Sequence, residues 1–186
     1  MQDLLSALPV DLPVGILVVQ HMPVGFIGPL AERLDTVCHL QVHEAKERDL
    51  IKPGHVYMAP SGKHMTVRRH SASEVFVHLT LSLGESLHTP SADVMMSSVA
   101  EVFHSAAMGI VLTGMGNDGT AGMQAIFREG GLTLGQDQAS CVVYGMPRSC
   151  AESGVLSQVV ALSDIPLHIL AAVGYRKPHQ RGAAGN

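Results

Sequence analysis

The hydrophobic pattern of this chain contains two continuous apolar runs, and each ends at a turn. Residues 14–20 (VGILVVQ) are followed by His21, and residues 108–113 (MGIVLT) are followed by Gly114. Short apolar runs rich in β-branched and aliphatic residues, without polar alternation, are typical of strands buried on both faces in a parallel sheet. The pattern therefore predicts two buried strands.

A helical pattern follows each of these strands. Apolar residues recur every three to four positions over residues 25–37, where Pro29 is tolerated because it lies in the first turn. A second helix covers residues 120–128 and ends at Gly130, and a third, capped by Ser91, covers residues 91–104 with an apolar face that includes Val94, Val99, Val102 and Phe103. Shorter strands are predicted near residues 39–42, 55–58, 132–136 and 155–160, an antiparallel hairpin at residues 65–69 and 75–81, and further helices at residues 146–152 and 166–173.

Strands that alternate with helices predict the fold class. We expect an α/β fold with a doubly wound, mostly parallel sheet, helices on both faces and one antiparallel hairpin. The length of 186 residues fits one domain, which we place at residues 1–174. From residue 175 onward the chain is polar and rich in Gly and Ala, so we expect a disordered tail at residues 175–186.

Charge and composition exclude several classes of protein. The formal net charge is -4 and no basic run is present, so we expect no nucleic-acid partner. No apolar stretch approaches the roughly 20 residues that span a bilayer, so we expect no membrane insertion. Met1 precedes Gln2 and Asp3 rather than a basic and then apolar signal segment, so we expect a cytoplasmic protein.

The cysteine and histidine patterns show no metal-site motif. The cysteines Cys38, Cys141 and Cys150 form no CxxC pair, and the 11 histidines include no HExxH pair. His39 and His43 alternate with apolar residues and should lie on one face of a surface strand. We therefore expect no metal and no other cofactor.

Two polar residues fall where catalytic groups are found in parallel sheets. His21 and Asp118 follow the two buried strands, and the carboxyl ends of parallel strands meet at one edge. A carboxylate there can orient an imidazole, as in a Ser-His-Asp triad. From spacing alone, an Asp118 that merely caps the helix at residues 120–128 is equally consistent, and His21 alone is more consistent with a ring bonded to local backbone.

The turn at residues 114–119 also matches a different motif. Its sequence, GMGNDG, fits the G-x-G-x-x-G dinucleotide fingerprint, and Asp137 lies 18 residues past Gly119. However, Asp118 would place a negative charge beside the pyrophosphate, at the helix N-terminus that should bind it. A dinucleotide-binding oxidoreductase therefore stays as the weaker alternative.

Four segments in order carry a family resemblance, and together they extend over roughly residues 1–170. The chain resembles the CheB family of chemotaxis protein-glutamate methylesterases at QHMP (20–23), HVYMAP (55–60), TGMGNDG (113–119) and ASCVVYGMPR (139–148). The resemblance implies hydrolysis of glutamate methyl esters on the cytoplasmic helices of chemoreceptors, and glutamine deamidation. It implies that His21 is the general base, Asp118 the carboxylate that orients it, and Met115 and Gly116 part of the oxyanion loop.

The chain also departs from this family. The family's nucleophile lies in a Gly-x-Ser-x-Gly-Gly loop about two dozen residues before the histidine, and no such loop occurs in these 186 residues. Ser6, Ser61, Ser91 and Ser140 do not lie at a strand-to-helix elbow. We therefore expect the first strand and the nucleophile to be missing, little esterase activity, and an unpaired sheet edge beside residues 14–20.

Other departures concern the substrate side and the partners. Thr89 stands where the family usually has arginine, and we expect no receiver domain upstream of this domain. Chemoreceptor helices are the expected partner and a separate receiver domain a further candidate. The sequence carries no signal for an oligomeric state. A non-catalytic protein that binds the receptor or another partner through the same cleft is the main alternative.

Overall fold

The structure, a computed structural model, describes residues 1–81 and 88–176. Its elements are α1 (Gln2–Ser6), β1 (Ile16–Val18), α2 (Ile27–Val37), β2 (Gln41–Glu44), β3 (His55–Met58), β4 (Lys63–Arg69), β5 (Val75–Leu81), α3 (Ala92–Phe103), a 3-10 turn (His104–Ala106), β6 (Met108–Val111), α4 (Thr120–Arg128), β7 (Leu132–Gln136), α5 (Met146–Glu152), β8 (Gln158–Val160) and α6 (Ile165–Ala172).

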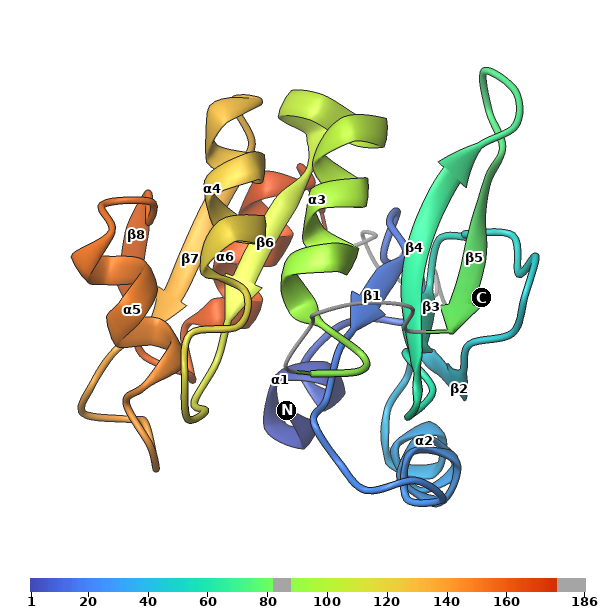
Figure 1. Cartoon of the computed structure of the whole chain (residues 1–186), viewed down its shortest axis with the longest axis horizontal. Helices are drawn as coiled ribbons and strands as arrows, with labels where there is room; N and C mark the ends of the chain where they lie inside the picture. The colour runs from blue at the N-terminus through green and yellow to red at the C-terminus, as the bar shows by residue number, and fades with distance from the viewer. Residues whose placement is uncertain (82–87, 177–186) are drawn as a thin grey trace, which may run out of the picture.

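The strands form two parallel sheets and one antiparallel hairpin (Figure 1). One sheet has the order β1-β3-β2, the other β6-β7-β8, and β4 pairs with β5. All pairs in the two three-stranded sheets are parallel, and β4 and β5 are antiparallel. The predicted α/β class, mostly parallel with one hairpin, is confirmed.

The first strand differs from its prediction. β1 is three residues long instead of the seven of residues 14–20, and its residues are half-buried instead of buried. Among the described residues, β1 pairs only with β3 and β6 only with β7, so each has one unpaired edge. Apolar side chains of both strands nevertheless pack against the same buried cluster, which places the two sheets side by side.

The second strand begins later than predicted. β2 starts at Gln41, so His39 precedes the strand and does not share a strand face with His43. The His43 ring instead packs edge-on against Tyr57 of β3, with 4.8 Å between ring centroids. The reason is that the parallel pairing of β2 with β3 sets where the strand begins, and this pairing starts at Gln41 and His55.

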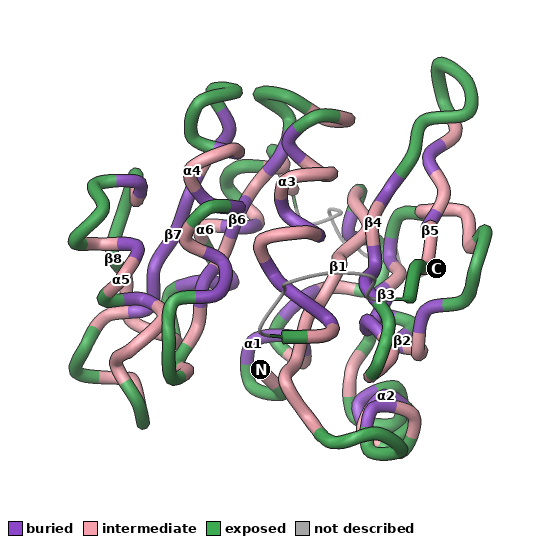
Figure 2. Tube along the Cα trace, viewed as in Figure 1, coloured by how far each residue is buried: buried purple, intermediate pink, exposed green. Residues whose placement is uncertain are grey.

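Two apolar clusters hold the layers together. One lies between the hairpin, α3 and α4, and the other joins α1, α2 and α6 to the first sheet. Figure 2 shows buried residues along β7 and on the packed sides of α3 and α4, whereas the tip of the hairpin is exposed. On α3 the fully buried residues are Ala92, Met95, Met96 and Ala100, whereas Val99 and Phe103 of the predicted face are partly buried against the same cluster, so the predicted face was only partly right. The helix packs against both β4 and α4. Because it has two neighbours, a wider set of its residues is buried than the sequence pattern predicts.

The C-terminal segment is only partly covered by the structure. The Tyr175 hydroxyl donates a hydrogen bond to Asp11 Oδ1 at 2.7 Å, so the tail predicted to start at residue 175 begins with a residue that is held in place. The rest of the predicted tail, residues 177–186, lies outside the described residues. The described helices include none with the length and apolar character that a membrane span requires.

A strained residue in the loop after β2 gives the first prediction. Arg48 has a φ of 67°, in the left-handed region where a Cβ is unfavourable. We expect Arg48→Gly to raise the free energy of unfolding by about 0.5–1 kcal/mol, measured by urea denaturation. Arg48→Ala, which keeps the Cβ, is the matched control. Equal stabilities for the two variants would contradict the strain.

The crossing of α3 and α4 gives the second prediction. A Cβ on Gly122 would lie 2.5 Å from the Met96 Cβ and 3.1 Å from the Asp93 Cα. We expect Gly122→Ala to lower the free energy of unfolding by about 1–3 kcal/mol, although alanine favours helix by about 1 kcal/mol. Thermal unfolding beside the control Gln124→Ala, on the same helix, measures the difference. A stabilised Gly122→Ala would show that the helices are not in close contact.

Candidate active site

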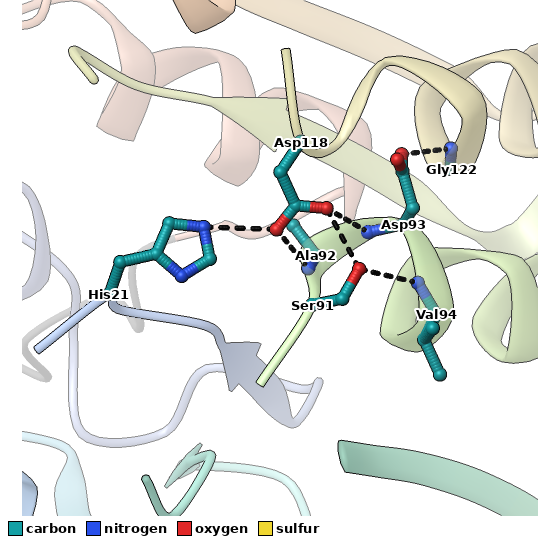
Figure 3. Close-up of polar contacts among 7 residues, drawn as sticks. All are labelled: His21, Ser91, Ala92, Asp93, Val94, Asp118 and Gly122. Carbon is teal, nitrogen blue, oxygen red and sulfur yellow. Dashed lines mark hydrogen bonds and ion pairs between the residues drawn. The ribbon is translucent and has the colours of Figure 1, made fainter. Parts of the chain in front are cut away.

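His21 and Asp118 are brought together at one edge of the fold (Figure 3). His21 follows β1, and Asp118 lies in the loop between β6 and α4. The His21 Nε2 lies 2.9 Å from the Asp118 Oδ2, with the histidine side chain 30% and the aspartate 6% exposed. Nε2 is buried and makes no hydrogen bond with good angles, so the contact with Asp118 is defined by distance and is an ion pair only when His21 is protonated. The two residues meet because both follow the carboxyl ends of parallel strands.

The Asp118 carboxylate is held by the first turn of α3. Its Oδ1 accepts hydrogen bonds from the Ser91 hydroxyl at 2.8 Å and the Asp93 N–H at 3.0 Å, and its Oδ2 accepts one from the Ala92 N–H at 2.7 Å. The N-cap residue of α4 is Gly119, which has no side chain to cap the helix. The alternative in which Asp118 caps α4 is therefore wrong, because its carboxylate caps α3 instead.

These contacts keep Asp118 ionised. Burial by itself would raise the pKa of this carboxyl group, but the hydrogen bonds from Ala92, Asp93 and Ser91, together with the nearby His21, lower the pKa below its ordinary value of 3.8. The N-terminus of a helix also favours a negative charge. An ionised carboxylate beside Nε2 favours the tautomer of the imidazole that carries its proton on that nitrogen.

Asp93 is a second carboxylate near the pair. Burial, and then the negative charge of Asp118, raise the pKa of Asp93 above 3.8, although a hydrogen bond from the Gly122 N–H opposes this. That N–H donates to Asp93 Oδ1 at 2.8 Å. Asp93 thus joins the start of α3 to the first turn of α4, the helix that follows the loop with Asp118.

The orientation of the His21 ring decides which nitrogen is available for chemistry. Since Nε2 faces Asp118, Nδ1 points away from the carboxylate (Figure 3). The ring also stacks on His88, with 4.7 Å between centroids and 24° between planes. A group that exchanges a proton with His21 would therefore approach Nδ1.

Met115 and Gly116 lie in the loop that carries Asp118, at the surface. Met115 is 83% exposed and Gly116 has a φ of 91°. The loop is held by the segment before α5, because the Gly114 N–H donates to the Val143 carbonyl at 3.0 Å and the Met146 N–H donates to the Gly114 carbonyl at 2.8 Å. The structure thus places Met115 and Gly116 on the same edge as His21 and Asp118, and both residues are exposed.

Other parts of the site were not anticipated from the sequence. Ser91 was predicted as a helix cap, and its Oγ does accept from the Val94 N–H at 3.4 Å, but its bond to Asp118 was missed. The Ser61 hydroxyl donates to the Met22 carbonyl at 3.0 Å and so ties the loop after β3 to the loop that carries His21. Only the proximity of loops distant in sequence creates these contacts.

The described residues do not meet the requirements of a metal site. Within residues 1–81 and 88–176, no three His, Cys, Asp or Glu side chains are arranged to hold a metal ion. The cysteines Cys38, Cys141 and Cys150 are free thiols. Burial is the main cause that raises the pKa of each of these thiols, which keeps them protonated and poorly nucleophilic at neutral pH.

Comparison with known proteins gives consistent results. The sequence profile of the CheB methylesterase family matches residues 1–169. The protein-glutamate methylesterase/protein-glutamine glutaminase of Moorella thermoacetica is 45% identical over 174 residues, which cover 93% of this chain and 41% of that protein. The Bordetella bronchiseptica protein of the same name is 46% identical over 176 residues, 94% of this chain and 50% of that protein.

A solved structure is also similar. The crystal structure of the Thermotoga maritima CheB methylesterase catalytic domain superimposes with a TM-score of 0.88 and 36% sequence identity, covering 91% of this chain and 89% of that one. The chain spans about half the length of the curated relatives that it matches.

Proposed function

Because the chain belongs to the CheB methylesterase family, we propose that it supplies the histidine and the aspartate of a protein-glutamate methylesterase active site. The observation that supports this most directly is the 2.9 Å contact between His21 Nε2 and Asp118 Oδ2 at the carboxyl edge of the strands. The proposed catalytic domain covers residues 1–174. The proposed substrate is a methylated glutamate on the cytoplasmic helices of a chemoreceptor, which implies a cytoplasmic protein.

The geometry supports a proton-transfer role for Nδ1. In the proposed mechanism, Nδ1 takes the proton of a serine hydroxyl as its oxygen attacks the ester carbonyl, and ionised Asp118 stabilises the imidazolium through Nε2. The proton then passes to the departing methoxide, which leaves as methanol. Water hydrolyses the acyl-enzyme by the same steps. The exposed loop at Met115 and Gly116 would stabilise the oxyanion, and a glutamine substrate would release ammonia instead.

The nucleophile in this proposal lies outside these 186 residues, which contain no Gly-x-Ser-x-Gly-Gly motif. The unpaired edges of β1 and β6 support the proposal, since a parallel strand between them would end at the edge that carries His21 and Asp118. A receiver domain, on the same or a separate chain, is the proposed regulatory partner. The relatives are about twice as long as this chain, which leaves room for such a domain in them.

Methanol release from methylated receptor tests the proposed function. We expect these 186 residues alone to be on the order of a million-fold slower than a chain that also contains a strand with the serine loop. Family-like rates from the 186 residues alone would contradict the missing nucleophile. Receptor binding without hydrolysis by the longer chain would instead support the non-catalytic alternative.

The dinucleotide-binding alternative can be tested by whether a dinucleotide stabilises the protein. Asp118 is ionised within the turn at residues 114–119, and Asp137 Oδ1 already accepts hydrogen bonds from the backbone N–H and hydroxyl of Ser140. We therefore expect millimolar NAD or NADP to leave the melting temperature unchanged. Stabilisation of about 2.7 kcal/mol, the value expected at a hundredfold excess over Kd, would support the oxidoreductase.

A further inference from the structure

A groove of about 480 Å³ lies against the outer face of the β4–β5 hairpin, beside the loop that follows β2. Arg68 of β4 and Phe76 of β5 lie directly opposite each other across the hairpin, and both line the groove. The His70 ring packs edge-on against Phe76, with 5.9 Å between centroids. Arg48 contributes from the neighbouring loop. The groove thus combines an aromatic side chain with three guanidinium groups, those of Arg48, Arg68 and Arg69, and with the carboxylates of Glu47 and Glu74.

The charge of this region differs from that of the rest of the chain. Residues 41–81 contain six lysines and arginines and four aspartates and glutamates, although the whole chain has a formal net charge of -4. The hairpin and the loop beside it therefore form a locally positive region on an acidic protein.

Both carboxylates and one guanidinium of the groove already have partners, and Glu74 Oε2 accepts from the Ser71 hydroxyl at 3.2 Å. Glu47 accepts from the Leu79 N–H at 2.6 Å and lies 2.9 Å from His78 Nδ1. The Arg69 guanidinium donates to the carbonyls of Ala72 and Val102 and lies over the Phe103 ring. These contacts neutralise or satisfy the two carboxylates and one of the three guanidinium groups of the groove.

Arg48 and Arg68 differ from these residues. Within the described residues neither guanidinium makes an ion pair within 4 Å or a hydrogen bond, although the charge of Arg68 is one of the smaller causes that lower the pKa of Glu47. Arg48 is also held in the left-handed region, with a φ of 67°, where glycine would be unstrained. Strained non-glycine residues that persist in a fold are concentrated at functional sites. Two unpaired guanidinium groups facing one groove are suited to binding carboxylates.

We propose that this groove binds an acidic protein segment, with Arg48 and Arg68 pairing with its carboxylates and an apolar side chain of the segment resting on Phe76. The volume fits several side chains rather than a single small anion. An aromatic side chain in the groove, opposite Arg68, favours a peptide over inorganic phosphate. None of these residues contacts His21 or Asp118, so the proposal is independent of the proposed catalytic role.

Fluorescence anisotropy with a labelled peptide of ten glutamates and one central phenylalanine tests the proposal. We expect the Arg48→Ala/Arg68→Ala variant to bind at least tenfold more weakly than the unaltered chain, and a matched glutamine peptide to bind as weakly to the unaltered chain. Arg128→Ala, on α4, and His21→Ala are controls that should bind normally. Binding should also weaken as salt is raised.

Three outcomes would overturn the proposal: no binding at low salt, equal binding by the unaltered chain and the double variant, or complete displacement of the peptide by millimolar inorganic phosphate. The last outcome would indicate a simple oxyanion site. Circular dichroism and urea unfolding of each variant separate loss of binding from loss of fold. Arg48→Gln/Arg68→Gln provides a second variant that keeps the side chains polar and long.

Discussion

Replacing His21 by glutamine is expected to reduce methyl-ester hydrolysis about 10⁴- to 10⁶-fold in a chain that also carries the serine strand. The amide group of glutamine reaches the position of Nε2, where it can donate to Asp118 Oδ2, but it provides no base at the position of Nδ1. The free energy of unfolding should therefore change little. Methanol release and urea unfolding, measured on the same preparation, check both parts of the prediction.

His21→Asn is the matched control for this experiment. The shorter amide group of asparagine corresponds to Nδ1 and does not reach Asp118, so this variant should lose both activity and about 1 kcal/mol of stability. A glutamine variant that keeps its rate would show that His21 is not the base. If His21→Asn kept its stability and His21→Gln lost it, the nitrogen that contacts Asp118 would be Nδ1 instead of Nε2.

Asp118→Ala is expected to lower the free energy of unfolding by about 3 kcal/mol. It leaves the N–H groups of Ala92 and Asp93 and the Ser91 hydroxyl without their acceptor, at a position that is only 6% exposed. An unsatisfied buried donor costs about 1–3 kcal/mol. Asp118→Asn keeps one acceptor oxygen and should cost roughly half as much. Urea unfolding at pH 7 measures both, and equal small effects would contradict the capping role.

The pH dependence of stability gives a further readout of Asp118. Its pKa in the folded state is lowered, so its stabilising contribution is fully present above the ordinary value of 3.8 and is lost as the pH falls through the folded-state pKa. The pKa of Asp93 is raised, so ionisation of Asp93 costs stability as the pH rises above 3.8. We expect Asp118→Asn to flatten the loss of stability in acid. Asp93→Asn should raise stability at pH 7, and a steeper acid loss in Asp118→Asn would contradict the assignment.

Local patterns predicted several elements with their exact bounds. β3, β7, α4 and α5 begin and end where the apolar runs and the flanking glycines and prolines predict. These elements depend on backbone preferences and on periodic burial, which are properties of short stretches of chain. The Ser91 cap of α3 was predicted for the same reason.

Predictions failed where a distant segment decided the outcome. The buried face of α3 was only partly predicted, because the helix lies between β4 and α4 and buries Met95 and Met96 as well. β1 is shorter and less buried than its sequence predicts, since a strand needs partners on both edges to be fully buried. The strain at Arg48 was not visible in the sequence, because it arises where the loop after β2 pairs with β5.

For the candidate site, the amino-acid sequence by itself determined that His21 and Asp118 follow parallel strands, and therefore that both lie at one edge. Only the tertiary structure decided that Asp118 is bound by the first turn of α3, that its negative charge faces Nε2, and that Nδ1 is directed away from it. The physical reason is that strand order and helix position depend on the packing of the whole core, whereas a turn after a strand depends on a few neighbouring residues.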